Sequence, residues 1–495
     1  MIYPRKYDVI VVGGGHAGCE AALAAARMRL TTLLLTQNLD TIGVMSCNPS
    51  IGGVAKGQVV RELDALGGQM ALSADKTGLH FRTLNTSKGQ AVHSPRAQCD
   101  KKLSALEMKR ALEDQPGLDV RQDEAAGLWI NGSRLRGVLS KRGARYEGAA
   151  VVLTTGTFLN GLAHIGLQQF AAGRCGEPPA LGLSVSLREL GFTVGRMKTG
   201  TPPRLHARSI DYSRCERQPS DVLPVPFSHR HERIDNTLLD CHVTYTNART
   251  HQVIRDNLDR SPLYSGVIQS IGPRYCPSVE DKVVRFPQKE RHQLFLEPEG
   301  WRTQEVYING LSTSLPEDAQ IALVHTVEGL EQAQIMRPGY AIEYDFCPPT
   351  QLQANLEAKS LPGLFFAGQI NGTTGYEEAA AQGLVAGVNA ALKLRGEAPL
   401  ILRRDEAYIG VLIDDLVTKG VDEPYRLFTA RAEHRLSLRA DNADLRLMET
   451  GRGLGLVPEP LFEAFRRYRD VVSDSACHED GALAPWSNAK ARAQR

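Results

Sequence analysis

A glycine-rich turn near the N-terminus is the first feature of this sequence with a clear chemical use. Residues 13–18 are Gly-Gly-Gly-His-Ala-Gly, which satisfies GxGxxG between an apolar run at 7–12 and an alanine-rich run at 17–27. In such a strand–turn–helix the glycines permit a tight turn, let the backbone approach a pyrophosphate, and let the helix pack against the sheet. The helix N-terminus adds free N–H groups and a positive dipole end. We therefore expect a dinucleotide site at Gly13, Gly14, Gly15, His16, Ala17 and Gly18.

The expected ribose contact departs from this pattern. An acidic residue normally follows the motif by about 20 positions, at the end of the second strand. The second predicted strand, 31–36, ends in Thr36, and Asp40 lies further into the loop. The sequence thus predicts nucleotide binding and leaves the ribose contact open.

A second glycine-rich turn, at 368–383, favours FAD over NAD as the bound nucleotide. It follows the apolar run 364–367 and leads into a helix of small residues. This resembles the closing motif of two-dinucleotide-binding-domain flavoproteins, in which a helix N-terminus faces the flavin ring and stabilises negative charge on it. Those flavoproteins usually carry Asp where this chain has Gln369.

Composition excludes several other classes of protein. The nine cysteines show no CxxC spacing, so we expect mostly buried, reduced thiols, no disulfide framework and no metal site. The missing CxxC also argues against a general flavin disulfide oxidoreductase. No apolar run approaches the roughly 20 residues of a membrane span, and no secretory leader begins the chain, so we expect a cytoplasmic protein without membrane association. A net charge of +2 does not by itself indicate a nucleic-acid partner.

The elements that position these motifs predict an α/β fold. Further apolar strands at 150–155 and 364–367 should join the first two in a parallel sheet, which makes the Rossmann-like FAD-binding domain discontinuous. We expect its first part at 1–200, with a small insertion near 95–145, and its return at 271–400. Residues 201–270 should form an inserted α/β second domain, and 401–495 a helical C-terminal part.

Long motifs across the chain resemble the MnmG (GidA) family of tRNA uridine 5-carboxymethylaminomethyl modification enzymes. Besides the two glycine-rich turns, the resemblance rests on segments along most of the chain: 45–53, 56–57, 64–68, 84–89, 198–204, 270–283, 431–435 and 441–447. It covers the chain from its N-terminus to about residue 460, and it places 431–435 in a helix.

The resemblance implies an activity and a set of partners. Members of the family add a carboxymethylaminomethyl or aminomethyl group to C5 of the wobble uridine (position 34) of tRNA. They use FAD, NADH, methylenetetrahydrofolate, and glycine or ammonium, and they act as homodimers that form a heterotetramer with the GTPase MnmE. The same resemblance implies a longer helical domain at the C-terminus, so we expect a truncated docking module. A weakly active or noncatalytic FAD-bound homologue is the alternative.

The resemblance also implies the roles of individual residues. FAD contacts fall on Ala125, Ala180 and Gln369 besides the first glycine-rich turn. Cys276 and Cys47 are the candidate catalytic thiols, because C5 of uracil becomes nucleophilic only after a group adds at C6. Cys276, among basic residues, is the favoured nucleophile, and Cys47 is a general acid or base on C5 or a second nucleophile. The inserted domain is NAD-associated, and the NAD-associated stretch comprises Gly272, Pro273, Arg274, Tyr275, Pro277, Ser278, Val279, Glu280, Asp281, Lys282, Val283, Val284, Arg285 and Phe286. Candidate contacts to tRNA phosphate or to folate are Lys56, Lys88, Arg96 and Arg204.

Overall fold

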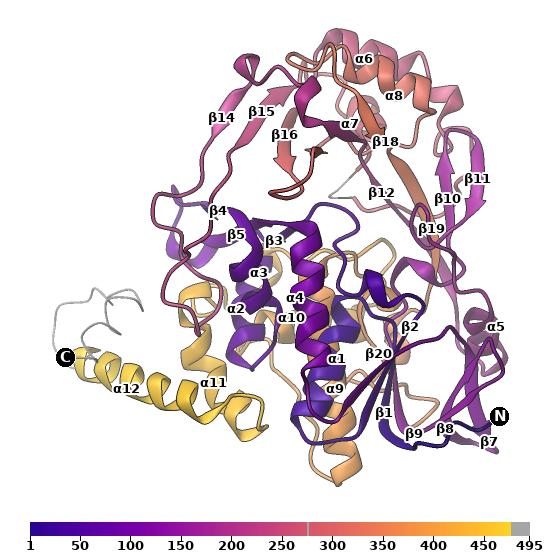
Figure 1. Ribbon diagram of the computed structural model, residues 1–495, viewed down its shortest axis with the longest axis vertical. Helices are drawn as coiled ribbons and strands as arrows, with labels where there is room; N and C mark the ends of the chain where they lie inside the picture. The colour runs from indigo at the N-terminus through magenta and orange to yellow at the C-terminus, as the bar shows by residue number, and fades with distance from the viewer. Residues whose placement is uncertain (275–276, 477–495) are drawn as a thin grey trace.

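A central mixed sheet lies in the lower half of the molecule, with helices beside it (Figure 1). The computed structural model describes residues 1–274 and 277–476. The strand order is β6-β2-β1-β9-β8-β7, and β20 pairs with β9. The bounds are β1 Tyr7–Val12, β2 Thr32–Thr36, β6 Leu118–Gln122, β7 Ala125–Asn131, β8 Arg134–Ser140, β9 Arg145–Leu153 and β20 Leu364–Phe366. Strands β6, β2, β1, β9 and β20 are parallel, so the predicted discontinuous α/β fold is confirmed.

Two small-residue helices pack against each other over this sheet. Helix α1 (His16–Arg27) is rich in alanine, and α9 (Tyr376–Arg395) carries Gly383 and Gly387 on the contact face. A Cβ at either glycine would collide with a backbone carbonyl oxygen of α1, at Ala17 or Ala21. The two glycine-rich turns of the sequence are therefore brought together by close backbone packing.

The region near 95–145 contributes more to the central fold than the insertion that we expected. Helix α4 (Lys101–Glu113) follows β5 (Ser94–Cys99), and β6 then joins the central sheet beside β2. Only β7 and β8 form an antiparallel extension. Helices α2 (Lys56–Ala65) and α3 (Met70–Thr77) lie beside a three-stranded sheet of β3 (Ser50–Gly52), β5 and β4 (Gly78–Leu84).

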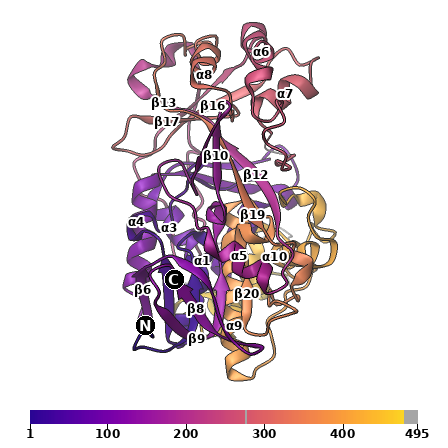
Figure 2. The ribbon, with the colours of Figure 1, turned by 90° about the vertical axis from the view of Figure 1, so that its right-hand side faces the viewer.

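A four-stranded sheet links the central sheet to an upper unit, as the turned view shows (Figure 2). It contains β10 (Leu162–Ile165), β11 (Gln168–Ala171), β12 (Gly195–Thr201) and β19 (Tyr340–Phe346), and helix α5 (Gly182–Glu189) lies between β11 and β12 in the chain. The upper sheet has the order β14-β15-β16-β17-β13-β18. Its strands are β13 Arg204–His206, β14 Glu216–Gln218, β15 Cys241–Tyr245, β16 Gln293–Pro298, β17 Glu305–Asn309 and β18 Ile335–Arg337.

The upper sheet extends past the boundary that we predicted at residue 270. Strands β16, β17 and β18 pair with β15 and β13, and α6 (Ala248–Arg255), α7 (Val279–Arg285) and α8 (Glu317–Val324) share one apolar core with the sheet. We therefore propose that the inserted domain runs to about residue 337, because its core cannot close without these later strands.

The C-terminal part is helical, as predicted, with one local exception. It contains α10 (Tyr408–Asp414), a π-helical turn (Asp415–Lys419), α11 (Ala443–Gly453) and α12 (Glu459–Ala476). A short 3-10 helix (Thr429–Arg431) ends at Arg431 and residues 433–437 form turns, so the predicted helix at 431–435 is wrong beyond Arg431. Arg404 donates hydrogen bonds to the carbonyl oxygen of Arg431 and to the carboxylate of Glu433. The Arg431 carbonyl oxygen is thereby occupied, although a continuing helix would need it as an acceptor. No helix among the described residues has the length and apolarity needed to cross a membrane.

Candidate functional site

A cleft opens at the carboxyl ends of β1, β2 and β9, where the first glycine-rich turn lies. Its empty volume is about 710 Å³, including the solvent-open mouth. In parallel α/β sheets, ligands bind outside this edge of the sheet. The lining residues include Gly13, Gly14, Gly15, Thr36, Gln37, Asn38, Asp123, Glu124, Ala125, Thr154, Thr155, Gly156, Phe158, Arg174, Glu177 and Ala180.

The three glycines of the turn differ in what surrounds them. Gly13 has φ +109°, and a Cβ there would collide with the carbonyl oxygen of Thr154. A Cβ at Gly18 would collide with the carbonyl oxygen of Gly13, whereas a Cβ at Gly15 would meet nothing within 4 Å. Gly15 precedes α1, and no side chain caps the helix there. The free N–H groups of α1 thus face open space, as an anion-binding helix N-terminus requires.

Buried polar atoms in the cleft fit a large polar ligand. Gln37 Nε2, Thr155 Oγ1 and Arg174 Nε have no hydrogen-bond partner within the described residues. Buried donors without partners are costly, so they indicate a group that the protein is built to hold. Together with the open backbone at Gly15, they fit the pyrophosphate and ribityl hydroxyls of a flavin dinucleotide.

The predicted cofactor contacts lie in or beside this cleft. Ala125 and Ala180 line it. Gln369 lies beside the cleft wall, since its Oε1 is 3.9 Å from the position of a Cβ at Gly156. Thr36 also lines the cleft, and its hydroxyl donates to the carbonyl oxygen of Asn38 at 3.4 Å.

A short chain of contacts joins the glycine-rich turn to Cys47. The ring of His16 lies 4.8 Å from the ring of Tyr376, the first residue of α9. The Tyr376 hydroxyl accepts a hydrogen bond from the backbone N–H of Cys47 at 2.7 Å. Burial, together with the positive charge of Arg174, lowers the pKa of His16 to about 4. His16 is therefore a neutral ring at physiological pH.

The half-buried Cys47 lies between the central sheet and the upper unit. Its Sγ is 3.0 Å from the Tyr307 hydroxyl of β17 and 3.8 Å from the carbonyl oxygen of Gly200. The neighbouring Asn48 donates to Glu297 of β16 at 2.6 Å. The cysteine loop is thus anchored to the sheet of the upper unit on one side and to the start of α9 on the other.

Arg204 anchors the same loop from inside the protein. Its guanidinium donates to Glu299 at 2.8 Å, to Thr201 and Pro202, and to the carbonyl oxygens of Ser46 and Cys47 at 3.0 and 3.1 Å. Although burial alone would lower the pKa of Arg204, the carboxylate of Glu299 raises it. Every donor of this 4% exposed residue is engaged, so a phosphate or folate contact at Arg204 would have to displace one of these internal hydrogen bonds, and that contact stays a prediction.

Two more of the four predicted phosphate or folate contacts are also engaged internally. Lys56 pairs with Glu377 and Glu378 at 3.0 and 3.3 Å, and its side chain is 18% exposed. Arg96 pairs with Glu297 at 2.6 Å. Both cations are neutralised by buried carboxylates, so an open phosphate contact would have to break an ion pair. Lys88 is exposed, and its role stays a prediction.

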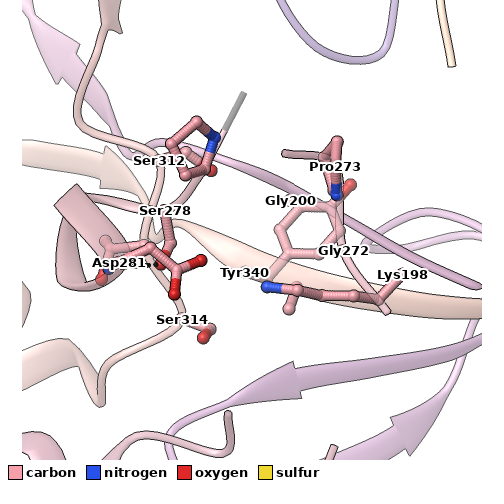
Figure 3. Close-up of a pocket in the computed structure, with 12 residues that line it drawn as sticks. Lys198, Gly200, Gly272, Pro273, Ser278, Asp281, Ser312, Ser314 and Tyr340 are labelled. Carbon is pink, nitrogen blue, oxygen red and sulfur yellow. Dashed lines mark hydrogen bonds between the residues drawn. The ribbon is translucent and has the colours of Figure 1, made fainter. Parts of the chain in front are cut away.

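Part of the predicted NAD-associated stretch lines a second, smaller pocket of about 310 Å³ at the start of α7: Gly272, Pro273, Pro277, Ser278 and Asp281 (Figure 3). The side chains of Lys198 and Asp281 point toward each other across it. Ser278 caps α7 by accepting from the N–H of Asp281. Lys282 donates to the carbonyl oxygen of Gly310 at 2.8 Å, and Arg285 lies 3.7 Å from Asp281 on the same helix. Tyr275 and the candidate thiol Cys276 lie outside the described residues.

The other described cysteines differ from Cys47 in their surroundings. Cys19, Cys99, Cys241 and Cys347 are buried, as expected for most of the thiols, and burial raises the pKa of Cys99 and Cys347 to about 12. A thiol held protonated in this way is a poor nucleophile. Cys175 is exposed and provides a reference thiol in the same chain.

Several residues of the site were not predicted from sequence. Thr155 and Arg174 lie in the cleft, and Tyr307 and Tyr376 hold Cys47. The end of the predicted strand 150–155 pointed to Thr155, since strand ends in such sheets face the ligand. Nothing local marks Tyr307, which is 260 positions from Cys47.

Comparisons with known proteins find the same family along most of the chain. A family model described as glucose inhibited division protein A matches residues 8–398. The chain is 61% identical over 470 residues to the tRNA uridine 5-carboxymethylaminomethyl modification enzyme MnmG of Geobacter metallireducens, and 60% identical to that of Geobacter sulfurreducens; each match covers 95% of this chain and 75% of the relative. The structure of Aquifex aeolicus GidA in its form II crystal matches with 51% identity and a TM-score of 0.91, over 97% of this chain and 78% of that one.

Proposed function

Because the chain belongs to the GidA family, we propose that it is an FAD-dependent enzyme that modifies C5 of the wobble uridine of tRNA. The group added is carboxymethylaminomethyl or aminomethyl. Relatives at 60% identity and above carry the name of this activity. The observation that carries the proposal is the position of Cys47, a half-buried thiol held between the nucleotide cleft and the upper unit.

FAD is the cofactor that best matches the cleft. The N-terminus of α1 would hold the pyrophosphate, and Thr155, Arg174 and Gln37 offer unpartnered polar atoms to the rest of the molecule. Gln369, near the N-terminus of α9, would lie beside the flavin ring. When bound, FAD would carry electrons and the one-carbon unit.

Cys47 has the chemistry that uridine modification needs. A thiolate that adds to C6 of uracil forms a C–S bond and moves an electron pair onto C5. C5 can then attack a one-carbon electrophile, after which the C5 proton and the thiolate leave. Cys276 is the second candidate for this role, so we assign the pair of thiols together and leave the order of their action to experiment.

The remaining participants follow from the family. We propose NADH as reductant, bound by the stretch 272–286, with methylenetetrahydrofolate and glycine or ammonium as sources of the added group. We also propose a cytoplasmic homodimer that associates with MnmE. Lys88 remains the predicted tRNA phosphate contact whose side chain is exposed.

A reconstitution experiment tests the activity. The purified chain is incubated with undermodified tRNA, MnmE, GTP, methylenetetrahydrofolate, glycine and NADH, and the nucleosides are analysed by mass spectrometry. We expect the modified uridine from the unaltered chain and none from Cys47→Ala or Cys276→Ala. The exposed Cys175→Ala is the matched control and should modify tRNA normally.

The outcomes separate the alternatives. Bound FAD with NADH oxidation and no modified nucleoside would contradict the proposed reaction and favour another flavin oxidoreductase. Bound FAD with neither activity would favour a noncatalytic homologue. Full modification of tRNA by Cys47→Ala would refute the role of Cys47 and leave the proposed reaction standing.

A further inference from the structure

The hydroxyl of Tyr307 contacts the sulfur of Cys47 directly. The two atoms are 3.0 Å apart, and either can be the donor. Tyr307 is only 5% exposed, so water competes little for this hydrogen bond. The other tyrosine bonded to this residue, Tyr376, contacts the backbone N–H and not the sulfur. Tyr307 is therefore placed to act on the thiol itself.

The sheet of the upper unit fixes the position of Tyr307. Tyr307 on β17 is directly opposite Arg204 on β13. The Arg204 guanidinium lies 4.8 Å from the centre of the tyrosine ring, within the range of a cation–π contact. The same guanidinium donates to the carbonyl oxygen of Cys47. One arginine thus positions both the phenol and the loop that carries the thiol.

From this geometry we propose that Tyr307 is a positioning residue for the Cys47 thiol. Its hydroxyl accepts a hydrogen bond from the protonated thiol, and it donates a hydrogen bond to the sulfur after the thiol has lost its proton to solvent. The proposal deepens the proposed function, because it says how the half-buried thiol is kept reactive. A hydroxyl can exchange the two roles by rotating its O–H bond, since it is both donor and acceptor. Hydrogen bonds to a charged acceptor are stronger than neutral ones, so this contact favours the thiolate.

Other titratable groups also face Cys47, and the test must separate Tyr307 from them. Arg204 lies beneath the loop with its partner Glu299, Tyr376 comes from α9, and Tyr340 comes from β19. All of these remain when only the Tyr307 hydroxyl is removed. A change caused by Tyr307→Phe therefore reports the loss of the Tyr307 hydroxyl, because the ring over Arg204 is retained.

The experiment measures the alkylation of Cys47 in the FAD-loaded enzyme. Limiting iodoacetamide is applied from pH 6 to 10, and labelling of the Cys47 peptide is quantified by mass spectrometry relative to the exposed Cys175. We expect Tyr307→Phe to slow the labelling of Cys47 about tenfold at neutral pH and to leave the labelling rate at high pH unchanged. Tyr7→Phe is the matched control, since the Tyr7 hydroxyl donates to Asp119 far from the site, and its profile should coincide with that of the unaltered enzyme.

Two results would overturn the proposal. One is an unchanged profile in Tyr307→Phe. The other is labelling reduced equally at every pH, which would indicate a displaced loop. If Tyr307→Phe does not fold, Tyr307 is replaced by 3-fluorotyrosine. Its more acidic hydroxyl is a stronger donor to the sulfur and should speed the labelling of Cys47 at neutral pH, and an unchanged labelling rate would refute the role. Alkylation needs no tRNA, so this result is independent of the reconstitution experiment.

Discussion

Replacing Arg204 by methionine should destabilise the protein strongly, because Arg204 neutralises a buried carboxylate and anchors the cysteine loop. The change leaves Glu299, which is 2% exposed, with Lys101 at 3.0 Å as its remaining ion-pair partner. It also removes hydrogen bonds to the carbonyl oxygens of Pro202, Ser46 and Cys47. Breaking a buried ion pair costs about 3–5 kcal/mol. Since Lys101 still compensates part of the charge, we expect about 3 kcal/mol at pH 7.

The pH dependence of this loss identifies its cause. Burial alone would raise the pKa of Glu299, but Arg204 and Lys101 hold it below its ordinary value of 4.5. In the unaltered protein the carboxylate thus contributes stability above pH 4.5, and this contribution is lost as the pH falls through the lower folded-state value. Without Arg204 the pKa of Glu299 should rise. Acid then protonates the buried carboxyl, which removes the cost of burying its charge in the variant. The difference in the free energy of unfolding between the unaltered protein and Arg204→Met should therefore become smaller below about pH 5.

Urea denaturation followed by circular dichroism at pH 7 and pH 4.5 measures both effects. Arg214→Met is the control, because Arg214 forms exposed ion pairs with Glu328 and Glu331, and its urea midpoint should not change. The double variant Arg204→Met with Glu299→Gln should recover part of the loss. A deficit under about 1 kcal/mol, or one that does not vary with pH, would refute the reasoning.

Three further predictions concern the cofactor cleft and its surroundings. Burial lowers the pKa of His16 from 6.5 to about 4, so between these pH values His16 takes up a proton only in the unfolded chain. The free energy of unfolding should therefore decrease by up to about 3 kcal/mol as the pH is lowered from 6.5 to 4. His16→Gln should remove this contribution, measured by urea titrations at pH 7.5 and pH 5. Lys56→Met should cost about 3 kcal/mol because it leaves two buried carboxylates unpaired, whereas Lys88→Met at an exposed position should leave the thermal midpoint unchanged. Gly13→Ala should abolish folding or FAD retention through its clash, while Gly15→Ala should fold and only weaken FAD binding measured by equilibrium dialysis.

Most of the central sheet could be predicted because its signals are local. Buried parallel strands appear as continuous apolar runs, and the glycine motif marks the turn between the end of β1 and the start of α1. The predicted strands at 7–12, 31–36, 150–155 and 364–367 therefore correspond to β1, β2, β9 and β20. The upper unit was predicted less well, since β13 and β18 pair across more than 100 residues and no local pattern marks where that pairing ends.

The charged candidates show a different limit of sequence reasoning. Lys56, Arg96 and Arg204 have the residue type of a phosphate contact, yet each pairs with a buried carboxylate: Glu377, Glu297 or Glu299. A basic side chain on an open surface and one in a buried ion pair look alike in sequence, because the distinguishing partner is distant in the chain. Lys88, in an exposed loop, kept the surface position that the hypothesis requires.

Local signals in the sequence were enough to predict the two glycine-rich turns and to identify the family, because strand hydrophobicity, glycine patterns and long motifs are properties of contiguous residues. It also singled out Cys47 as a candidate thiol. The neighbours of that thiol become visible only in the folded chain: Tyr376 comes from the start of α9, and Arg204 and Tyr307 come from paired strands of the upper sheet. Hydrogen bonds and ion pairs act over a few ångströms in space, whatever the separation along the chain. The chemistry of Cys47 is therefore set by residues that become its neighbours only when both units fold.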